Sequence, residues 1–203
     1  MFFLVGAKNT VIIAAFSVLF GVVLGTLLAL MKQSKIRILK SLSSAYIEFV
    51  RGTPLLVQLF IIYYGLPINL SAILAGIVAL SLNSGAYVAE IIRAGIEAVD
   101  KGQMEAARSL GMNHIESMRY VIMPQALKNI LPVLGNEFIT IIKESSIVSV
   151  IGIPEIMYNA ETVRGNTFKP FEPLLVAAVI YFVLTYSLSK LVRRFERRLK
   201  TSD

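Results

Sequence analysis

Residues 10–31, TVIIAAFSVLFGVVLGTLLALM, decide the fold, because this long apolar run contains no charged side chain. The hydrocarbon core of a bilayer is about 30 Å thick and is crossed by about 20 residues of helix. The run is longer than the apolar segment of a secretory signal, and no strongly basic segment precedes it. It therefore predicts a helix that stays in the membrane.

The composition of the whole chain supports this prediction. The chain has 203 residues, of which 56% are hydrophobic and only 16% are charged, and its mean hydropathy is +0.71. These values exclude an ordinary soluble domain. The absence of Cys and the single His exclude disulfides, thiolate sites and multi-histidine metal sites, so no catalytic or metal site is expected.

Four further runs are long and apolar enough to be predicted spans. Residues 130–153 are the least regular, because Glu137, Lys143 and Glu144 interrupt the run. The predicted spans after the first are residues 45–66, 71–92, 130–153 and 171–192. The sequence therefore predicts an all-α membrane protein with five transmembrane helices in a single domain, residues 1–203.

Lysine and arginine residues are distributed unevenly between the predicted connections. With five spans, fifteen of them share one side, in residues 32–44, 93–129 and 190–200, and the other side receives three. Basic connections favour the cytoplasm, which places the N-terminus outside and the C-terminus in the cytoplasm. We interpret the basic C-terminal segment as an anchor for anionic lipid headgroups rather than as a nucleic-acid-binding arm.

The long segment between the third and fourth spans is predicted to form a cytoplasmic helix-turn-helix at about residues 97–124. Gly111 is expected to end the first helix, and Pro124 to limit the second. Two patterns within the segment resemble capping boxes, Asp100 with Gln103 and Asn113 with Glu116.

The first of these helices contains Glu105-Ala106-Ala107-Arg108, followed by Gly111. Small alanines allow a partner surface to approach the helix closely, Gly111 permits a tight turn, and Glu105 offers a charge to a basic partner. Glu-Ala-Ala-x3-Gly in a cytoplasmic loop two spans from the C-terminus resembles the coupling loop of ABC importer permeases.

The resemblance extends over nearly the whole chain, through three further motifs in the expected order. They are Arg51-Gly52-Thr53-Pro54-Leu55-Leu56-Val57-Gln58, Gly85-Ala86-Tyr87-Val88-Ala89-Glu90-Ile91-Ile92-Arg93-Ala94-Gly95-Ile96, and Lys143-Glu144-Ser145-Ser146 followed by Ile151-Gly152. These motifs resemble the polar amino-acid permeases of the ABC superfamily.

The resemblance implies a type I ABC importer-like fold and a multi-pass subunit of a prokaryotic cell membrane. Its implied partners are two ATPase subunits, a second permease chain (a copy or a paralogue), an extracytoplasmic substrate-binding protein, an amino-acid substrate and membrane lipid. No nucleic acid is implied. The chain has no P-loop, so it binds no cofactor itself, and ATP and Mg are expected on the separate ATPase.

Charged groups at membrane depth cost at least about 2.5–3.5 kcal/mol each near the bilayer centre, so each one requires an explanation. The charged groups within the predicted spans of this chain fall on helix faces in three of the spans. The break at Gly52–Pro54 offers backbone N–H groups that can bind a substrate carboxylate. The predicted path-lining or substrate-binding residues are Arg51, Gly52, Thr53, Pro54, Gln58, Asn83, Tyr87, Glu90, Glu137, Thr140, Lys143, Glu144, Ser145 and Ser146. The alternative is that these groups pair with each other, as Glu48 with Arg51 or Glu90 with Arg93, and only hold helices together.

Four glutamates at membrane depth against Arg51 and Lys143 favour a substrate with a cationic side chain, such as arginine, lysine or histidine.

A different class of function is an autonomous channel or secondary transporter in which Glu137, Lys143 and Glu144 relay ions. An inverted repeat would favour this function, and the hydropathy pattern shows none. A membrane enzyme is third, because the chain lacks a His pair, a Cys or a metal cluster. Residues 152–170 are interpreted either as a short interfacial helix that meets the binding protein or as a plain surface loop.

Overall fold

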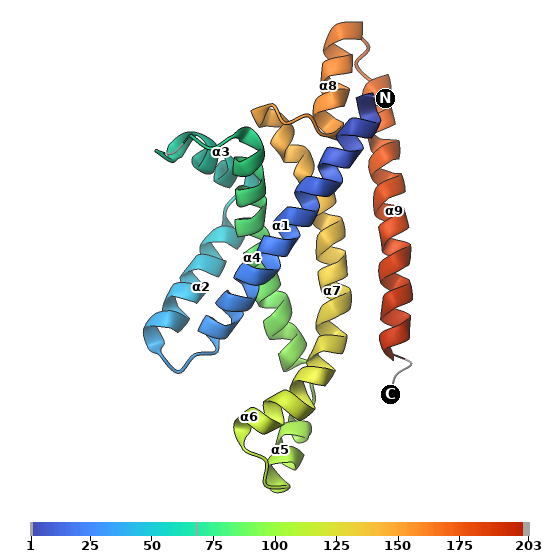
Figure 1. The fold of residues 1–203 in the computed structure, drawn as a ribbon. Helices are drawn as coiled ribbons and strands as arrows, with labels where there is room; N and C mark the ends of the chain where they lie inside the picture. Colours follow the sequence, from blue (N-terminus) through green and yellow to red (C-terminus); the bar gives the residue numbers. More distant parts are fainter. Residues whose placement is uncertain (1, 68, 201–203) are drawn as a thin grey trace.

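The computed structural model describes residues 2–67 and 69–200, and the regular structure in them is entirely helical (Figure 1). Residues 1, 68 and 201–203 of the predicted single domain lie outside this description. The α-helices are α1 (Phe2–Lys32), α2 (Arg37–Gly52), α3 (Leu55–Gly65), α4 (Ala72–Glu97), α5 (Lys101–Ser109), α6 (His114–Ser117), α7 (Met123–Glu144), α8 (Ile156–Thr167) and α9 (Glu172–Lys200). A π-helical turn, η1 (Met118–Ile122), precedes α7, and a 3₁₀ segment, η2 (Ser145–Ile151), follows it.

Three of these helices, α1, α4 and α9, are long and apolar enough to cross a membrane. The predicted span at 45–66 is a broken one, because α2 and α3 meet at an angle of 106° and together give a fourth candidate. The predicted span at 130–153 corresponds to the second half of α7 and to η2. The α7 helix is not among the helices apolar enough to be chosen by composition, and its side chains include Lys128, Glu137, Lys143 and Glu144.

The α1 helix packs along α4 through small residues. A Cβ placed on Gly25 would lie 2.6 Å from Cβ of Val88, and one on Gly21 would lie 2.9 Å from Cβ of Ser84. Because no side chain fits at either position, the two backbones approach closely, as in other membrane helix pairs.

The α8 end of the molecule is held by a buried polar cluster. The Glu155 carboxylate is fully buried and accepts hydrogen bonds from the Tyr158 N–H at 2.7 Å and from the Tyr181 hydroxyl at 2.6 Å. Asn9 of α1 donates to the Pro154 carbonyl at 2.7 Å, and the Asn159 amide donates to the Phe2 carbonyl at 3.0 Å. These bonds join α1, α8 and α9.

The α5–α6 hairpin (residues 101–117) lies at the opposite end from the N-terminus and α8, as Figure 1 shows. The prediction that Pro124 ends the second helix is wrong, because α6, η1 and α7 run on without interruption from His114 to Glu144. Pro124 stands in the first turn of α7 directly after the π-helical turn. Proline is tolerated there because the wider turn accommodates a residue that lacks an N–H.

Candidate functional site

The break between α2 and α3 is maintained by one amide side chain. Gln58 donates to the Val50 carbonyl at 2.7 Å, to the Thr53 carbonyl at 3.1 Å and to Thr53 Oγ1 at 2.9 Å. Asn83 of α4 donates to Gln58 Oε1 at 3.1 Å. Gln58 and Asn83 are both buried, so their polar groups hold the break and attach it to α4.

The break also leaves space next to the first turn of α3. A Cβ placed on Gly52 would meet no atom within 4 Å. Pro54 stands at the N-cap of α3 in an extended conformation, the usual backbone conformation of an N-cap residue. The backbone N–H groups in the first turn of α3 therefore follow directly on the open position at Gly52.

Several predicted residues of α7 and η2 come together next to this break. Leu55, Thr140, Lys143, Glu144, Ser146 and Ile147 line an open cavity of about 510 Å³. One carboxylate and one ammonium group thus share a cavity with two hydroxyl groups. These are the groups needed to orient a zwitterionic ligand.

Two other predicted residues of this region lie outside the cavity lining. Ser145 is fully buried, and its hydroxyl donates to the Ile142 carbonyl at 2.8 Å. Glu137, one turn further toward the α5 end, accepts a hydrogen bond from Ser84 Oγ at 3.0 Å.

A second charged group forms around Glu90. Its carboxylate meets Lys32 at 2.5 Å, Arg93 at 2.8 Å and Arg51 at 3.9 Å, and Arg93 also pairs with Glu97 at 2.5 Å. Arg51 lies over the half-exposed Tyr87 ring at 5.5 Å. Glu90 therefore joins α1, α2 and α4, and the predicted pairing with Arg93 is present.

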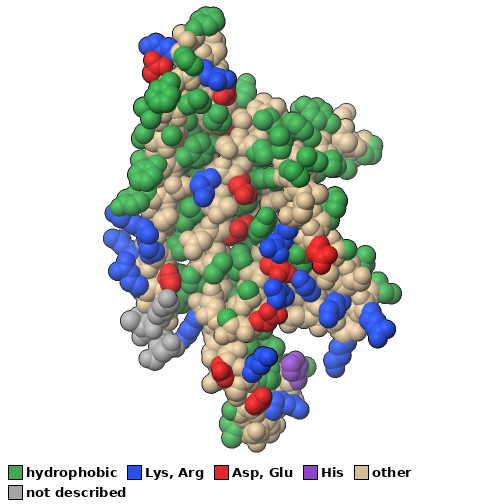
Figure 2. All heavy atoms as spheres, turned by 180° about the vertical axis from the view of Figure 1, so that it is seen from behind, with side chains coloured by type: hydrophobic (Ala, Val, Ile, Leu, Met, Phe, Trp, Pro, Cys, Tyr) green, Lys and Arg blue, Asp and Glu red, His purple; other side chains and the backbone are tan. Residues whose placement is uncertain are grey.

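Figure 2 shows acidic and basic side chains across the middle of one face of the molecule, with hydrophobic side chains around them. Sequence reasoning missed Lys32 as a partner of Glu90 and Ser84 as a partner of Glu137. Fifty-eight residues separate the first pair and fifty-three the second, so neither pair has a local spacing signal. Among the described residues, no group of three or more His, Asp or Glu side chains is arranged to hold a metal ion.

The α5–α6 hairpin is a compact, capped structure. Asp100 accepts from the Gly102 N–H at 2.7 Å, which caps α5 without the predicted involvement of Gln103. The predicted capping box of Asn113 and Glu116 is present. Gly111 has a φ of +88°, the left-handed conformation that a tight turn after a helix requires.

The hairpin presents a mixed surface at its tip. Glu105, Ala106 and Arg108 are exposed, whereas Ala107 is buried against the chain itself. Leu110 and Ile115 are 82% and 75% exposed, although both are large apolar residues. Sequence reasoning missed these two, and their position on either side of the Gly111 turn was the available signal.

Comparison with known proteins gives consistent matches over the whole chain. Residues 21–201 match the family described as "Binding-protein-dependent transport system inner membrane component". The putative glutamine transport system permease protein GlnP of Rickettsia bellii and the arginine transport system permease protein ArtQ of Bacillus subtilis are each 45% identical, over 100% of this chain and 94% of the relative.

Solved structures agree with these relatives. A crystal structure of an amino acid ABC transporter with histidines matches with a TM-score of 0.95 and 55% identity, over 97% of this chain and 94% of that one. The inward-facing MetNI methionine ABC transporter matches with a TM-score of 0.79 and 21% identity, over 98% of this chain and 96% of that one, which concerns the fold alone.

Proposed function

The chain belongs to the family of inner membrane components of binding-protein-dependent transport systems, and from this premise we propose how it works within an amino-acid ABC importer. It is a permease subunit, not an enzyme, and the ATPase is a separate chain. It has the fold of a type I ABC importer permease. These conclusions replace the autonomous-transporter alternative.

We propose five spans, formed by α1, the broken α2–α3 pair, α4, α7 with η2, and α9. The N-terminus and α8 lie outside, and the C-terminus lies in the cytoplasm of a prokaryotic cell. The observation that supports this orientation is the position of the basic segments. The α1–α2 connection, the α5–α6 hairpin and the basic end of α9 all lie at the same end of the molecule (Figure 1).

In this orientation, the α5–α6 hairpin is the coupling element that contacts an ATPase subunit. The exposed Leu110 and Ile115 supply apolar anchors, and Glu105 and Arg108 supply charges around them. Exposed apolar residues surrounded by polar ones are typical of a protein-binding surface. ATP binding by the partner, with its Mg, would draw two such hairpins together and open the path toward an external binding protein.

The test of this assignment is retention of the ATPase. We expect the wild-type chain, captured from its native membrane, to retain a P-loop ATPase. Leu110→Asp and Glu105→Lys should each lose it, because both side chains are exposed and their replacement leaves the fold of the chain intact. The matched control is Glu161→Lys, the same charge change at a partly exposed position on α8, and loss of the ATPase in this control would contradict the assignment.

The substrate path is proposed at the cavity of Thr140, Lys143, Glu144 and Ser146, with a second permease chain completing it. The Glu144 carboxylate can accept hydrogen bonds from the cationic side chain of an amino acid. The Lys143 ammonium and the α3 N-terminus suit a carboxylate. This arrangement supports a cationic amino acid, and relatives named for arginine and for glutamine define the two substrates to compare.

Uptake by the assembled transporter in vesicles tests the preference. Glu144→Gln removes one charge-assisted contact, so we expect arginine uptake at low concentration to fall about tenfold while glutamine uptake is retained. An equal loss for both amino acids would contradict the preference for cationic substrates.

A further inference from the structure

The helix that leads from the α5–α6 hairpin into α7 is irregular over residues 118–124. In the π-helical turn, the Met123 N–H donates to the Met118 carbonyl, which lies five residues back instead of four. Pro124 follows directly and has no N–H to donate. A π-helical turn and a proline are each a common cause of bending in a helix, and here they are adjacent. In Figure 1 the chain changes direction between α6 and α7, where these residues lie.

Packing around these residues is loose. Cavities of about 580, 350 and 500 Å³ adjoin them, and the Met118 side chain lines all three. The first cavity borders the end of α4 and the start of α5, the second borders α6, and the third lies between α1, α4 and α7. Met104 and Met123 also line these cavities. Methionine side chains are flexible and fill irregular space, so the region can change its shape without losing its apolar contacts.

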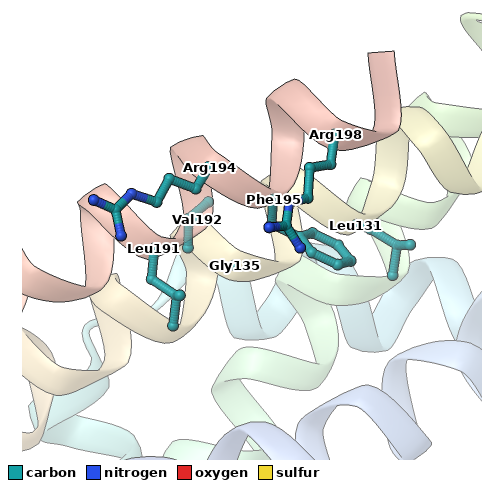
Figure 3. Close-up of a pocket in the computed structure, with 7 residues that line it drawn as sticks. All are labelled: Leu131, Gly135, Leu191, Val192, Arg194, Phe195 and Arg198. Carbon is teal, nitrogen blue, oxygen red and sulfur yellow. The ribbon is translucent and has the colours of Figure 1, made fainter. Parts of the chain in front are cut away.

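Further along α7, the packing is closer. No side chain fits on Gly95 of α4, because Ile130 of α7 lies directly against it. A Cβ placed on Gly135 would lie 2.8 Å from Cγ2 of Val192, and Figure 3 shows Val192 of α9 next to Gly135 of α7. From Ile130 onward, α7 is therefore packed firmly against α4 and α9. This part of the helix carries Thr140 and Glu144 of the proposed path.

The hairpin on the other side of the irregular segment is held by its own caps, Asp100 and the Asn113–Glu116 capping box. A hydrogen bond at the surface links it to α7. The Gln125 amide donates to Gln103 Oε1 of α5 at 3.2 Å. An exposed bond of this kind exchanges its partner for water at little cost. The hairpin and α7 are thus two firm parts with a loosely packed segment between them.

We propose that residues 118–124 form a joint, at which the hairpin and α7 change their mutual angle during the transport cycle. The joint lets the hairpin stay seated on the ATPase while α7 tilts and the path opens or closes. A rigid connection would instead make the hairpin tilt with α7 and lose part of its contact with the ATPase. The inference rests on the proposed contact between the hairpin and the ATPase.

A reversible bridge across the joint tests it. The chain contains no cysteine, so Gln103→Cys/Gln125→Cys places two thiols where the side chains already meet. A short bis-methanethiosulfonate reagent bridges the thiols, and a reductant removes the bridge. We expect the bridged transporter to keep its ATPase but to lose arginine and glutamine uptake by at least about tenfold, because a conformational step is blocked. Reduction should restore uptake, and undiminished uptake in the bridged transporter would overturn the proposal.

The matched control is Ile38→Cys/Leu42→Cys. Both residues are exposed and lie four residues apart on α2, so a bridge between them stays within one helix. We expect this bridge to leave uptake unchanged. An equal loss of uptake in the control would contradict the proposal, because it would mean that bridging impairs the transporter wherever it occurs.

Hydrogen exchange in the unmodified transporter gives a second measurement that needs no variant. Local opening of the joint should make the amides of residues 118–124 exchange at least about threefold faster during ATP turnover than at rest. The amides of residues 136–142, on the firmly packed part of α7, should exchange equally in both states. Unchanged exchange of residues 118–124 would overturn the proposal.

Retention of the ATPase distinguishes failure of the joint from failure of the hairpin assignment. A wild-type chain that retained no ATPase would contradict the assignment, and the joint with it. A bridged transporter that kept both its ATPase and its uptake would overturn the joint alone.

Discussion

The two ends of the molecule hold their helices together in different ways. At the α8 end, the fully buried Glu155 accepts hydrogen bonds from a backbone N–H and a tyrosine hydroxyl. At the α5 end, Glu90 meets three cations, Lys32, Arg51 and Arg93, whose side chains are between 25% and 45% exposed.

This difference bears on which end can move. When a buried hydrogen bond breaks, each group is left unsatisfied away from water and its full desolvation penalty opposes the separation. Charged groups near water can instead replace a partner with solvent at small cost. The α8 end should therefore move as one unit, and the α1, α2 and α4 contacts at the α5 end should rearrange more easily. A permease that opens and closes needs both properties.

The largest expected effect is at the α8 end. Glu155→Ala leaves the Tyr181 hydroxyl and the Tyr158 N–H without their acceptor and creates a cavity. We expect a loss of about 3 kcal/mol in the free energy of unfolding. For a chain of this length, that loss lowers the melting temperature by about 6–12 °C. Thermal unfolding in detergent, followed by size-exclusion chromatography, measures the shift.

The control for this substitution is Glu161→Ala, which removes a carboxylate from the surface of the same helix. Its ion pair with Arg164 is half-exposed and should contribute little. Equal shifts in melting temperature for the two variants would mean that the buried cluster around Glu155 contributes no more to stability than the surface ion pair of Glu161.

The importance of Glu155 could not be predicted from the sequence around it. Residues 152–170 contain Pro154, two glutamates and Arg164, which is equally typical of a surface loop and of an interfacial helix. The structure has a helix there, α8, and buries its N-cap residue against Tyr181. That burial depends on α1 and α9, which are distant in the sequence, so no local pattern indicates it.

Other features were local and therefore predictable. The long apolar run from residue 10 lies within α1, Gly52 and Pro54 mark the break between α2 and α3, and Gly111 adopts the left-handed turn. Each depends on helix-forming tendency or backbone conformation within a few residues. The roles of Gln58 and Asn83 in holding the break depend on contacts between helices, which residue spacing does not determine.

At the α5 end, a smaller effect of a different kind is expected. Glu90→Gln removes the charge that Lys32, Arg51 and Arg93 share, and should cost about 1–2 kcal/mol at low salt. Because these groups are partly exposed, the difference from wild type should shrink as NaCl is raised. Melting curves at several salt concentrations measure it.

The control at this end is Glu97→Gln, since the Glu97 side chain is 61% exposed and its ion pair with Arg93 lies at the exposed edge of the same network. Its effect should be within about 0.5 kcal/mol of wild type. A Glu90→Gln defect that does not change with salt would place this cluster in the same category as Glu155 and remove the contrast between the two ends.

The smallest expected effect is that of Glu155→Gln, which distinguishes the contribution of the side-chain shape of Glu155 from that of its charge. Burial raises the pKa of the Glu155 carboxyl above its ordinary value, and the hydrogen bond from Tyr181 opposes this only in part. The folded chain therefore keeps the proton at pH values where the unfolded chain has released it. The stability contributed by this group is present at low pH and is lost as pH rises from the ordinary carboxyl pKa, about 4.3, through the raised value.

Glu155→Gln keeps the shape and an acceptor oxygen but removes the titration. We expect its stability to lie within about 1 kcal/mol of wild type, with the decline toward neutral pH reduced. Glu161→Gln, on the exposed face of α8, should retain the wild-type decline. If Glu155→Gln were as unstable as Glu155→Ala, the ionised carboxylate itself would be required, and the α8 end would depend on charge as the Glu90 cluster does.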